Sequence, residues 1–321
     1  MDAPGYGAAM TSEEREGHPV VSAAEGARRL GVPAVDGREP RNGTVAVNGV
    51  RLHYLDWAGD APQTILCLHG GSANARVWDF TALGLISRYR VVALDLRGHG
   101  DSEWDPTGRY DRETYLEDIE AVIRHLGAGP VSLIAHSMGG TNALIFAAQH
   151  PSLVRALVQV EAGPEIAPDA YHRADRARSY GPLEGSYDSF VKQAVQYSRF
   201  WEPWQIHYHL RSMLRELPDG RWTWKTDPAF RSTARREDGR GRPGPQALWP
   251  LWEGLQCPTL IVRGSFSRIF PADIAAMMQR RLARSRLVEI QGAGHRVHED
   301  RPAELVSAVV DFLREVDRGA F

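Results

Sequence analysis

Short apolar segments that end in glycine or a polar residue recur along this chain and alternate with amphipathic stretches. The segments between them, such as TYLEDIEAVIRHLG (114–127) and GTNALIFAAQHP (140–151), have helical patterns. Apolar strands that alternate with amphipathic helices predict a mostly parallel sheet covered on both faces. The strand segments are TILCLHG (64–70), RVVALDL (90–96), VSLIA (131–135), ALVQVE (156–161), PTLIVRG (258–264) and RLVEIQG (286–292).

An antiparallel hairpin is expected before the first of these segments. TVAV (44–47) and VRLHYLDW (50–57) flank Asn48-Gly49, and this dipeptide favours a tight two-residue turn. Together with the six segments above, the hairpin predicts an α/β fold with an eight-stranded sheet. We assign its core to residues 41–164 and 251–321.

Two parts of the chain depart from the alternation. Residues 1–40 are polar and rich in Gly, Ala and Pro, so we expect a poorly ordered arm with a short helix at SAAEGARRL (22–30). Residues 165–250 fall between the sixth and seventh strands, look mainly helical and predict an inserted cap. This segment is rich in aromatic residues: Tyr171, Tyr180, Tyr187, Phe190, Tyr197, Phe200, Trp201, Trp204, Tyr208, Trp222 and Trp224.

Composition narrows the classes of function. The 321 residues are 43% hydrophobic with a net charge of −2, which suits one large domain with an insertion and gives no electrostatic footprint for nucleic acid. No apolar run approaches ~20 residues, so no membrane span is expected. The first residues have neither the basic start nor the apolar core of a secretory signal. Cys67 and Cys257 are expected to be buried free thiols, and we predict a cytoplasmic protein with a small-molecule substrate.

The segment LIAHSMGG (133–140) has the pattern of a strand, a sharp turn and a helix. Small residues at 135, 139 and 140 allow the turn to be tight, which holds the hydroxyl of Ser137 above the sheet edge. The amino end of the following helix would point at that hydroxyl. This pattern predicts a nucleophilic serine, with Ala135 in the place of the usual first glycine; a purely structural turn is the alternative.

A nucleophilic serine needs an oxyanion site and a base. The third strand ends in LHGGS (68–72), so the backbone N–H groups of Gly71 and Met138 are the expected oxyanion donors. His295 follows the eighth strand on a glycine-flanked loop, where the base is expected. His298 is interpreted as a supporting or surface residue, because a metal pair with His295 would lack further ligands. HYH (207–209) is interpreted as helix surface and packing, with metal binding as the alternative.

The chain resembles the α/β-hydrolase fold superfamily over residues 41–321. The resemblance rests on LHGGSANARVW (68–78), VVALDLRGHGDS (91–102), IAHSMGG (134–140), CPTLIVRG (257–264) and GAGHRVHEDRP (292–302). It implies a catalytic triad with no cofactor and no metal. A serine at 137 is inconsistent with the dehalogenase and epoxide-hydrolase mechanisms of this superfamily, which need an aspartate. Asp95 lies in a segment that is mostly structural in these proteins.

The acid of the triad is missing from its usual place. Most members carry it after the seventh strand, where this chain has Gly264 to Arg268 without a carboxylate. Some members, including certain haloalkane dehalogenases and zearalenone lactonases, carry it one strand earlier, and Glu161 stands there. We therefore predict that Glu161 orients His295; a structural salt bridge is the alternative role. Arg268 is expected to pair with Glu161 or to lie in solvent.

Two other carboxylates remain alternatives for the triad acid. Asp273 lies beyond Pro271 on the expected following helix, and Glu165 lies on the loop beyond Gly163-Pro164.

These expectations define a cap-bearing serine hydrolase of carboxylic esters or lactones that acts through an acyl-enzyme. The aromatic cap suggests a bulky apolar substrate, with Trp201, Trp204 and Arg268 as candidate binding residues; alternatively, these rings form only the core of the cap. Motifs alone also allow carbon–carbon bond hydrolysis, amide or thioester cleavage and peracid formation. A receptor-like binding protein with weak turnover is the alternative from another class. The sequence does not specify the oligomeric state.

Overall fold

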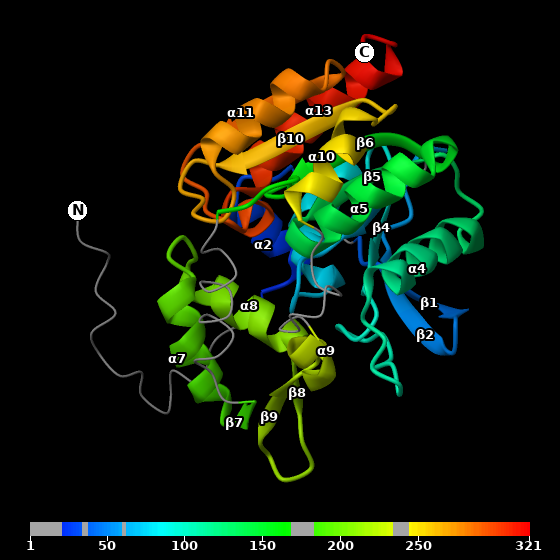
Figure 1. Ribbon diagram of the computed structural model, residues 1–321. Helices are drawn as coiled ribbons and strands as arrows, with labels where there is room; N and C mark the ends of the chain where they lie inside the picture. Colours follow the sequence, from blue (N-terminus) through cyan, green and yellow to red (C-terminus); the bar gives the residue numbers. More distant parts are fainter. Residues whose placement is uncertain (1–20, 34–37, 60–61, 168–182, 234–243) are drawn as a thin grey trace.

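The computed structural model describes residues 21–33, 38–59, 62–167, 183–233 and 244–321. Its main element is an eight-stranded sheet in the order β1-β2-β4-β3-β5-β6-β10-β11 (Figure 1). All neighbours are parallel except β1 with β2 and β2 with β4. The predicted eight strands, mostly parallel arrangement and amino-terminal hairpin are therefore confirmed.

The hairpin forms at the predicted dipeptide. β1 (Arg41–Val47) pairs with β2 (Val50–Asp56), and both turn residues have left-handed backbones, with φ of 47° at Asn48 and 83° at Gly49. Such angles match the right-handed twist of the two strands. The hairpin adds antiparallel pairing at one edge of an otherwise parallel sheet.

The parallel strands are buried on both faces, except the edge strand β11, in which only Ile290 is buried. Their bounds are β3 (Thr64–Leu68), β4 (Arg90–Leu94), β5 (Val131–His136), β6 (Val154–Val160), β10 (Thr259–Gly264) and β11 (Ser285–Ile290). In β5, Leu133 and Ala135 pack into one apolar cluster and Ile134 into the other. Because successive side chains alternate between faces, a strand between two helical layers must be apolar throughout.

Helices cover each face of the sheet. Residues of α4 (Arg112–His125), α5 (Ser137–Gln149), α10 (Pro245–Glu253) and α11 (Ala272–Arg281) pack into one cluster. Residues of α2 (Ala23–Arg29), α3 (Asp79–Leu85) and α13 (Pro302–Asp317) pack into the other. None of the helices among the described residues combines the length and apolar character needed to cross a bilayer.

The prediction of a poorly ordered amino-terminal arm needs a correction. The predicted short helix exists as α2, but it is part of the core, because Ala23, Ala24 and Ala27 are buried against α3. Residues 1–20 and 34–37, which belong to the predicted arm, lie outside the described residues. The small side chains that made this segment look weakly structured are what allow the helix to pack closely.

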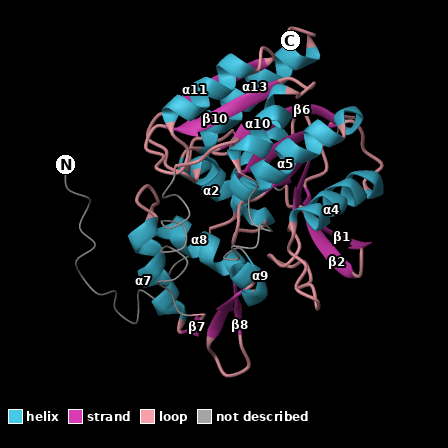
Figure 2. Cartoon of the chain, viewed as in Figure 1, coloured by secondary structure: helices cyan, strands magenta, loops and turns pink. Residues whose placement is uncertain are grey.

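The cap differs from a purely helical insertion. Besides α7 (Tyr187–Tyr197), α8 (Pro203–Met213) and α9 (Pro228–Thr233), it contains a three-stranded antiparallel sheet in the order β7-β9-β8 (Figure 2). These strands are short: β7 (Glu184–Gly185), β8 (Leu214–Glu216) and β9 (Trp222–Trp224). Residues 168–182, with Tyr171 and Tyr180, and residues 234–243 lie outside the described residues.

The predicted end of the cap at residue 250 falls inside α10. Leu248, Trp249 and Trp252 of this helix are buried in the same apolar cluster as α4 and α5. Figure 1 accordingly shows α10 beside α5 on the body of the molecule, whereas α7, α8 and α9 lie below it. We therefore assign α10 to the core.

Candidate active site

Ser137 lies at the sharp turn between β5 and α5. Its backbone is in the left-handed region, with φ of 52°, which a non-glycine residue adopts at some energetic cost. A side-chain carbon at Gly139 would lie 2.5 Å from the carbonyl oxygen of His69 and 2.7 Å from that of Leu68. The glycine after Ser137 therefore allows α5 to start directly against the end of β3.

The predicted oxyanion loop lies against this turn. A side-chain carbon at Gly70 would be 3.2 Å from Cβ of Ser137, so the backbone of the Gly70-Gly71 pair passes close to the serine. His69 stabilises the loop, because its Nδ1 donates to the carbonyl of Gly70 (2.7 Å) and its Nε2 accepts from Leu96 N–H (3.0 Å). Met138 is in the first turn of α5, where backbone N–H groups have no partner within the helix.

His295 follows β11 and is held next to the serine turn by a contact with His136, the residue before Ser137. Nε2 of His136 donates a hydrogen bond of 2.8 Å to the backbone carbonyl of His295. The rings of these two histidines are 4.6 Å apart between centroids. Since His136 directly precedes Ser137, this contact brings the predicted base and the predicted nucleophile to the same edge of the sheet.

Glu161 contacts His295. Nδ1 of the imidazole lies 2.9 Å from Oε2 of the carboxylate, and the carboxylate is buried whereas the imidazole retains about a quarter of its exposure (27%). Glu161 directly follows β6 and has a left-handed backbone with φ of 54°. Two strained non-glycine residues, Ser137 and Glu161, thus occur within one cluster, which is typical of functional sites.

The loop that normally carries the triad acid holds the carboxylate of Glu161 instead. The backbone N–H of Gly264 donates to Oε1 (2.8 Å), and the hydroxyl of Ser267 donates to Oε2 (2.5 Å). Sequence reasoning missed both partners, although a hydroxyl in the loop that faces a displaced carboxylate is a signal that could have been used. These bonds fix the carboxylate in the plane where it meets His295.

Burial dominates the electrostatics of Glu161. Loss of hydration raises the pKa of this carboxyl to about 8, while the hydrogen bonds from Ser267 and Gly264 and the charge of Arg263 act in the opposite direction. A carboxyl in these surroundings gains most from a positive charge that develops on His295. Proton transfer to the imidazole would produce that charge.

The alternative acids do not contact His295. Asp273 is exposed in the first turn of α11, as its place beyond Pro271 predicted. Glu165 is half-buried, and no hydrogen bond or ion pair with His295 is found for it among the described residues. Asp95 accepts hydrogen bonds from His53 (2.7 Å) and from two backbone N–H groups, so it is structural, as expected.

Of the two expectations for Arg268, the exposed position holds and the pairing with Glu161 does not. Arg268 is exposed, and the ion pair of Glu161 within the described ranges is the one with His295. The nearby cation is Arg263, which donates to the carbonyl of Phe270 (2.9 Å) and pairs with Glu289 (2.5 Å). Position 268 points outward because the loop turns at Ser267 to place its hydroxyl on Glu161.

His298 and the HYH segment are more buried than predicted. His298 stacks on Trp78 at 4.5 Å between ring centroids and His209 lies 3.4 Å from Glu299, and each has about 1% of its surface exposed. Burial lowers the pKa of both imidazoles, to about 3 for His209, so they are neutral packing groups.

Side chains with a spacing suited to a metal occur elsewhere. Among the described residues, one group has donor atoms close enough to share an ion: His53, Asp95 and Asp101. Nδ1 and Nε2 of His53 already bond Asp95 and Asn42, and the carboxylate of Asp101 pairs with Lys225. The donor atoms are therefore used in structural contacts, so this group is not interpreted as a metal site.

The two cap tryptophans selected from the sequence have different surroundings. Trp201 is buried, and its Nε1 donates to Oδ1 of Asp300 (3.1 Å), three residues beyond the start of α12 (Val297–Asp300). Trp204 packs edge-on against Phe80 at 6.1 Å and lies under the guanidinium of Arg29 at 5.5 Å. Trp204 therefore joins α8 to α2 and α3, which gives it a packing role that the sequence did not predict.

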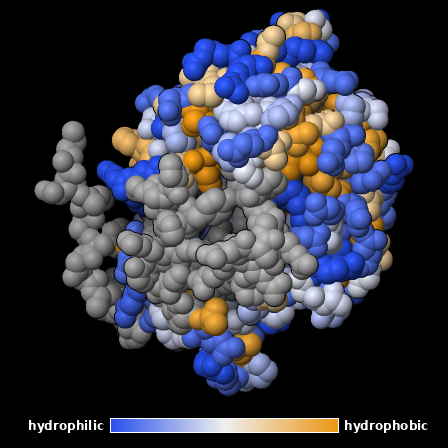
Figure 3. All heavy atoms as spheres, in the orientation of Figure 1, coloured by the Kyte–Doolittle hydropathy of each residue, from blue (hydrophilic) through white to orange (hydrophobic). Residues whose placement is uncertain are grey.

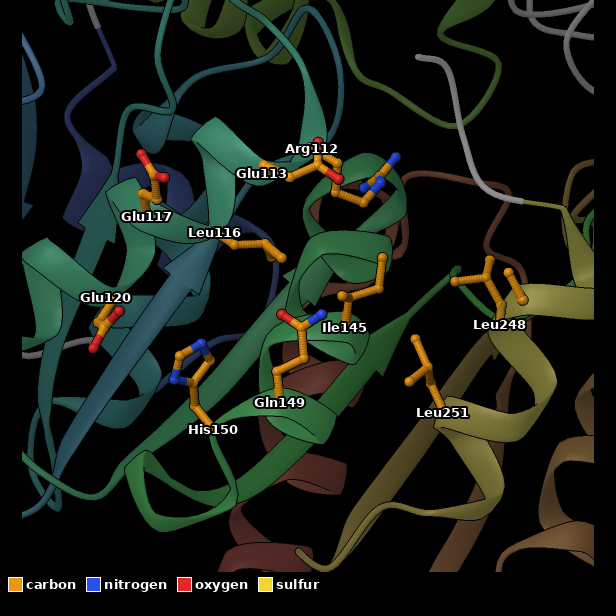
Figure 4. A pocket seen from close by; sticks show the side chains of 11 residues that line it. Arg112, Glu113, Leu116, Glu117, Glu120, Ile145, Gln149, His150, Leu248 and Leu251 are labelled. Carbon is orange, nitrogen blue, oxygen red and sulfur yellow. The ribbon is translucent and has the colours of Figure 1, made fainter. Parts of the chain in front are cut away.

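A groove of about 350 Å³ lies apart from these residues, among α4, α5 and α10 (Figure 4). Its floor is apolar, and Figure 3 shows hydrophobic atoms over α5 and α10 on this face. Carboxylates of α4 line one side. Since α5 begins at Ser137 and contributes Ile145 and Gln149 to the groove, the groove belongs to the opposite end of that helix.

The chain belongs to the alpha/beta hydrolase fold family, whose model matches residues 63–302. Esterase Rv0045c of Mycobacterium tuberculosis is 31% identical over 265 residues, which is 80% of this chain and 85% of the esterase. The 2-(acetamidomethylene)succinate hydrolase of Mesorhizobium japonicum is 28% identical over 263 residues, 78% of this chain and 87% of that protein. A crystal structure of E-2-(acetamidomethylene)succinate hydrolase superimposes with a TM-score of 0.76 at 25% identity, over 86% of this chain and 99% of the other. These relatives support a hydrolase.

Proposed function

We propose that this protein is a serine hydrolase that cleaves a carboxylic ester or lactone through an acyl-enzyme, without a cofactor. The observation that carries the proposal is the Glu161–His295 hydrogen bond of 2.9 Å, formed next to the strained turn at Ser137. A buried carboxylate on Nδ1 makes Nε2 the acceptor nitrogen of the imidazole, which is the tautomer that a serine nucleophile requires.

The proposed steps follow from these residues. Ser137 attacks the carbonyl carbon while His295 takes its proton, and the developing oxyanion accepts hydrogen bonds from the N–H groups of Gly71 and Met138. His295 then gives the proton to the departing alcohol, which leaves the acyl group on Ser137. A water molecule, deprotonated by His295, releases the acid and restores the serine. Glu161 stabilises the imidazolium in both halves.

Two lines of support favour an ester of an apolar substrate. The described cap is rich in aromatic side chains, and its residue Trp201 bonds to Asp300 near His295, so we propose an apolar wall on this side of the site. Among the relatives, the protein of M. tuberculosis is named an esterase.

The expected location, the cytoplasm, rests on the free buried thiols of Cys67 and Cys257.

The test is a p-nitrophenyl ester assay with active-site labelling by a fluorophosphonate. Ser137→Ala is expected to lose at least about a thousandfold in kcat and all labelling. Ser307→Ala, on the exposed face of α13, is the matched control and is expected to behave as wild type. Residual activity of Ser137→Ala above a few per cent, with contamination excluded, would contradict the serine mechanism.

A second series of assays, with esters of different size, tests the proposed substrate class. Acetates of aryl alcohols of increasing size are expected to show a rising kcat/KM, because each buried apolar carbon adds binding energy. A flat series would refute the apolar pocket. Poor fluorophosphonate labelling together with negligible turnover on esters, lactones, amides and thioesters would instead indicate the receptor-like alternative.

A further inference from the structure

Asp300 bridges the cap and the loop that carries His295. Its Oδ1 accepts from the indole Nε1–H of Trp201 (3.1 Å), and its Oδ2 accepts from the backbone N–H of Gly294 (2.8 Å). Trp201 precedes α8 in the cap, whereas Gly294 directly precedes His295. One buried carboxylate thus connects two segments about a hundred residues apart in the sequence.

Other contacts join the same two segments. The guanidinium of Arg296 lies 4.9 Å from the ring centroid of Trp201, and the amide of Gln205 donates to the carbonyl of Glu299 (3.2 Å). Phe200 packs so close to Gly294 that a side-chain carbon there would lie 3.1 Å from the phenyl ring. The start of α8 therefore rests directly on the residues around His295.

On its other side, the same loop is held by the core. His136 donates to the carbonyl of His295 (2.8 Å), which lies after the Cα of His295. The N–H of Gly294, which lies before that Cα, donates to Asp300. One of these bonds originates in the core sheet. The other depends on Asp300 and, through it, on the cap. The position of the imidazole is then sensitive to where the cap sits.

We propose that Asp300 and Trp201 are positioning residues that couple the seating of the cap to the placement of His295. This inference rests on the proposed function, in which His295 is the base. With Trp201 bonded, Asp300 is held in place to fix Gly294 and the imidazole stays aligned with Glu161. When the cap shifts, Asp300 loses one partner, and the loop of His295 gains freedom.

The chemistry of Asp300 makes the coupling specific. Two N–H donors approach its two different oxygens, and an amide offers an acceptor at only one of these positions. Asp300→Asn must therefore lose one bond or place its NH₂ against a donor. Burial also raises the pKa of Asp300 to about 6, opposed by the Gly294 N–H, so this acid is kept at a site where an apolar residue would be easier to bury.

The test compares Trp201→Phe, Asp300→Asn and the double variant of these two changes with two control variants, all in the full chain. Trp201→Phe removes the indole N–H and keeps a ring; Asp300→Asn removes the acceptor of one of the two bonds. Trp222→Phe in the cap strand β9 and Glu304→Gln at the exposed start of α13 are the matched controls. The kinetic constants are normalised to fluorophosphonate-titrated sites, and folding is monitored by circular dichroism.

We expect kcat to fall about tenfold in Trp201→Phe and about a hundredfold in Asp300→Asn, with KM nearly unchanged. The double variant should match Asp300→Asn alone, because both changes break one chain of contacts. The acidic limb of kcat/KM should move to lower pH, since a loosened Glu161 stabilises the imidazolium less. The controls should behave as wild type.

Three results would each overturn the coupling: losses of kcat that add in the double variant, a change confined to KM, or wild-type kcat in Trp201→Phe. If Asp300→Asn does not fold, Trp201→Phe alone decides the outcome. Ser137→Ala and His295→Ala are measured in parallel. If these two are inactive while Trp201→Phe is normal, only the coupling fails; if they remain active, the proposed function itself fails.

Discussion

Glu161→Gln is the substitution that most directly tests the proposal that Glu161 is the acid of a catalytic triad. The side chain keeps its size, but one of its two acceptor oxygens becomes an NH₂ donor. In the structure, three donors face this carboxylate: Nδ1 of His295 (2.9 Å), the hydroxyl of Ser267 (2.5 Å) and the N–H of Gly264 (2.8 Å). An amide cannot satisfy all three.

Both orientations of the amide are unfavourable. If its oxygen faces His295, the NH₂ meets the N–H of Gly264. If its NH₂ faces His295, the imidazole must accept at Nδ1 and carry its proton on Nε2, where it cannot take the proton of Ser137. The corresponding change in the serine-protease template lowers kcat about ten-thousand-fold, which is about 5 kcal/mol of transition-state stabilisation.

The assay is steady-state hydrolysis of a p-nitrophenyl ester, with thermal unfolding recorded for each variant. We expect Glu161→Gln to lose about three to four orders of magnitude in kcat and to stay folded. Asp273→Asn, on the exposed start of α11, and Glu165→Gln are the controls and should retain wild-type kcat. Near-wild-type kcat in Glu161→Gln, with a collapse in either control, would show that the acid was wrongly assigned.

Three further predictions concern Glu161 and the turn at Ser137. In a Glu161→Ala background, Ser267→Asp should recover at least about tenfold in kcat, because its side chain reaches the vacated position, whereas Arg268→Asp should recover nothing; equal recovery would refute this. Gly139→Ala should destabilise the protein by about 2–4 kcal/mol in urea unfolding, since its Cβ would meet two carbonyl oxygens at 2.5 and 2.7 Å; an unchanged midpoint would contradict the packing. Burial raises the pKa of Glu161 from its ordinary value of 4.5 to about 8, so the folded state holds a proton on this carboxyl more tightly than the unfolded state does. The resulting contribution to stability is fully present below pH 4.5 and is lost as the pH rises towards 8. The melting temperature of Glu161→Gln relative to wild type should therefore rise between pH 5 and pH 8, and a difference independent of pH would show that the carboxyl is not perturbed.

The local sequence pattern was sufficient for the main sheet. Each parallel strand of the eight-stranded sheet was predicted from a short, mainly apolar run that ends in glycine or a polar residue, and the hairpin turn was predicted from the dipeptide Asn48-Gly49. Ser137 and His295 were also predictable, because each depends on a few neighbours: the small residues around the turn, and the glycines of a loop after a strand. Backbone sterics act within a few residues, so they can be read from the sequence.

The contacts of Glu161 combine local and distant information. Its place at the end of β6 was visible in the sequence, but the hydroxyl of Ser267 that holds it lies 106 residues away. Arg268, for which pairing with Glu161 was one of two expectations, is the next residue and is exposed. Which of two adjacent side chains turns inward depends on the path of the loop against Ala293 and Gly294, and the local sequence does not encode that path.

Burial across distant segments was decided by the tertiary structure alone. The Ala-rich residues of α2 gave no sign that they would pack on α3, and the aromatic α10 looked like cap although it packs on α5. His298 is buried because Trp78, 220 positions earlier, stacks on it, and Asp300 meets Trp201 of the cap. The sequence by itself determined the strands, the sharp turn at Ser137 and the position of His295, because local sterics and periodicity specify them. The partners of Glu161 and Asp300 follow only from the folded chain, because hydrogen bonds between distant segments depend on how the layers pack.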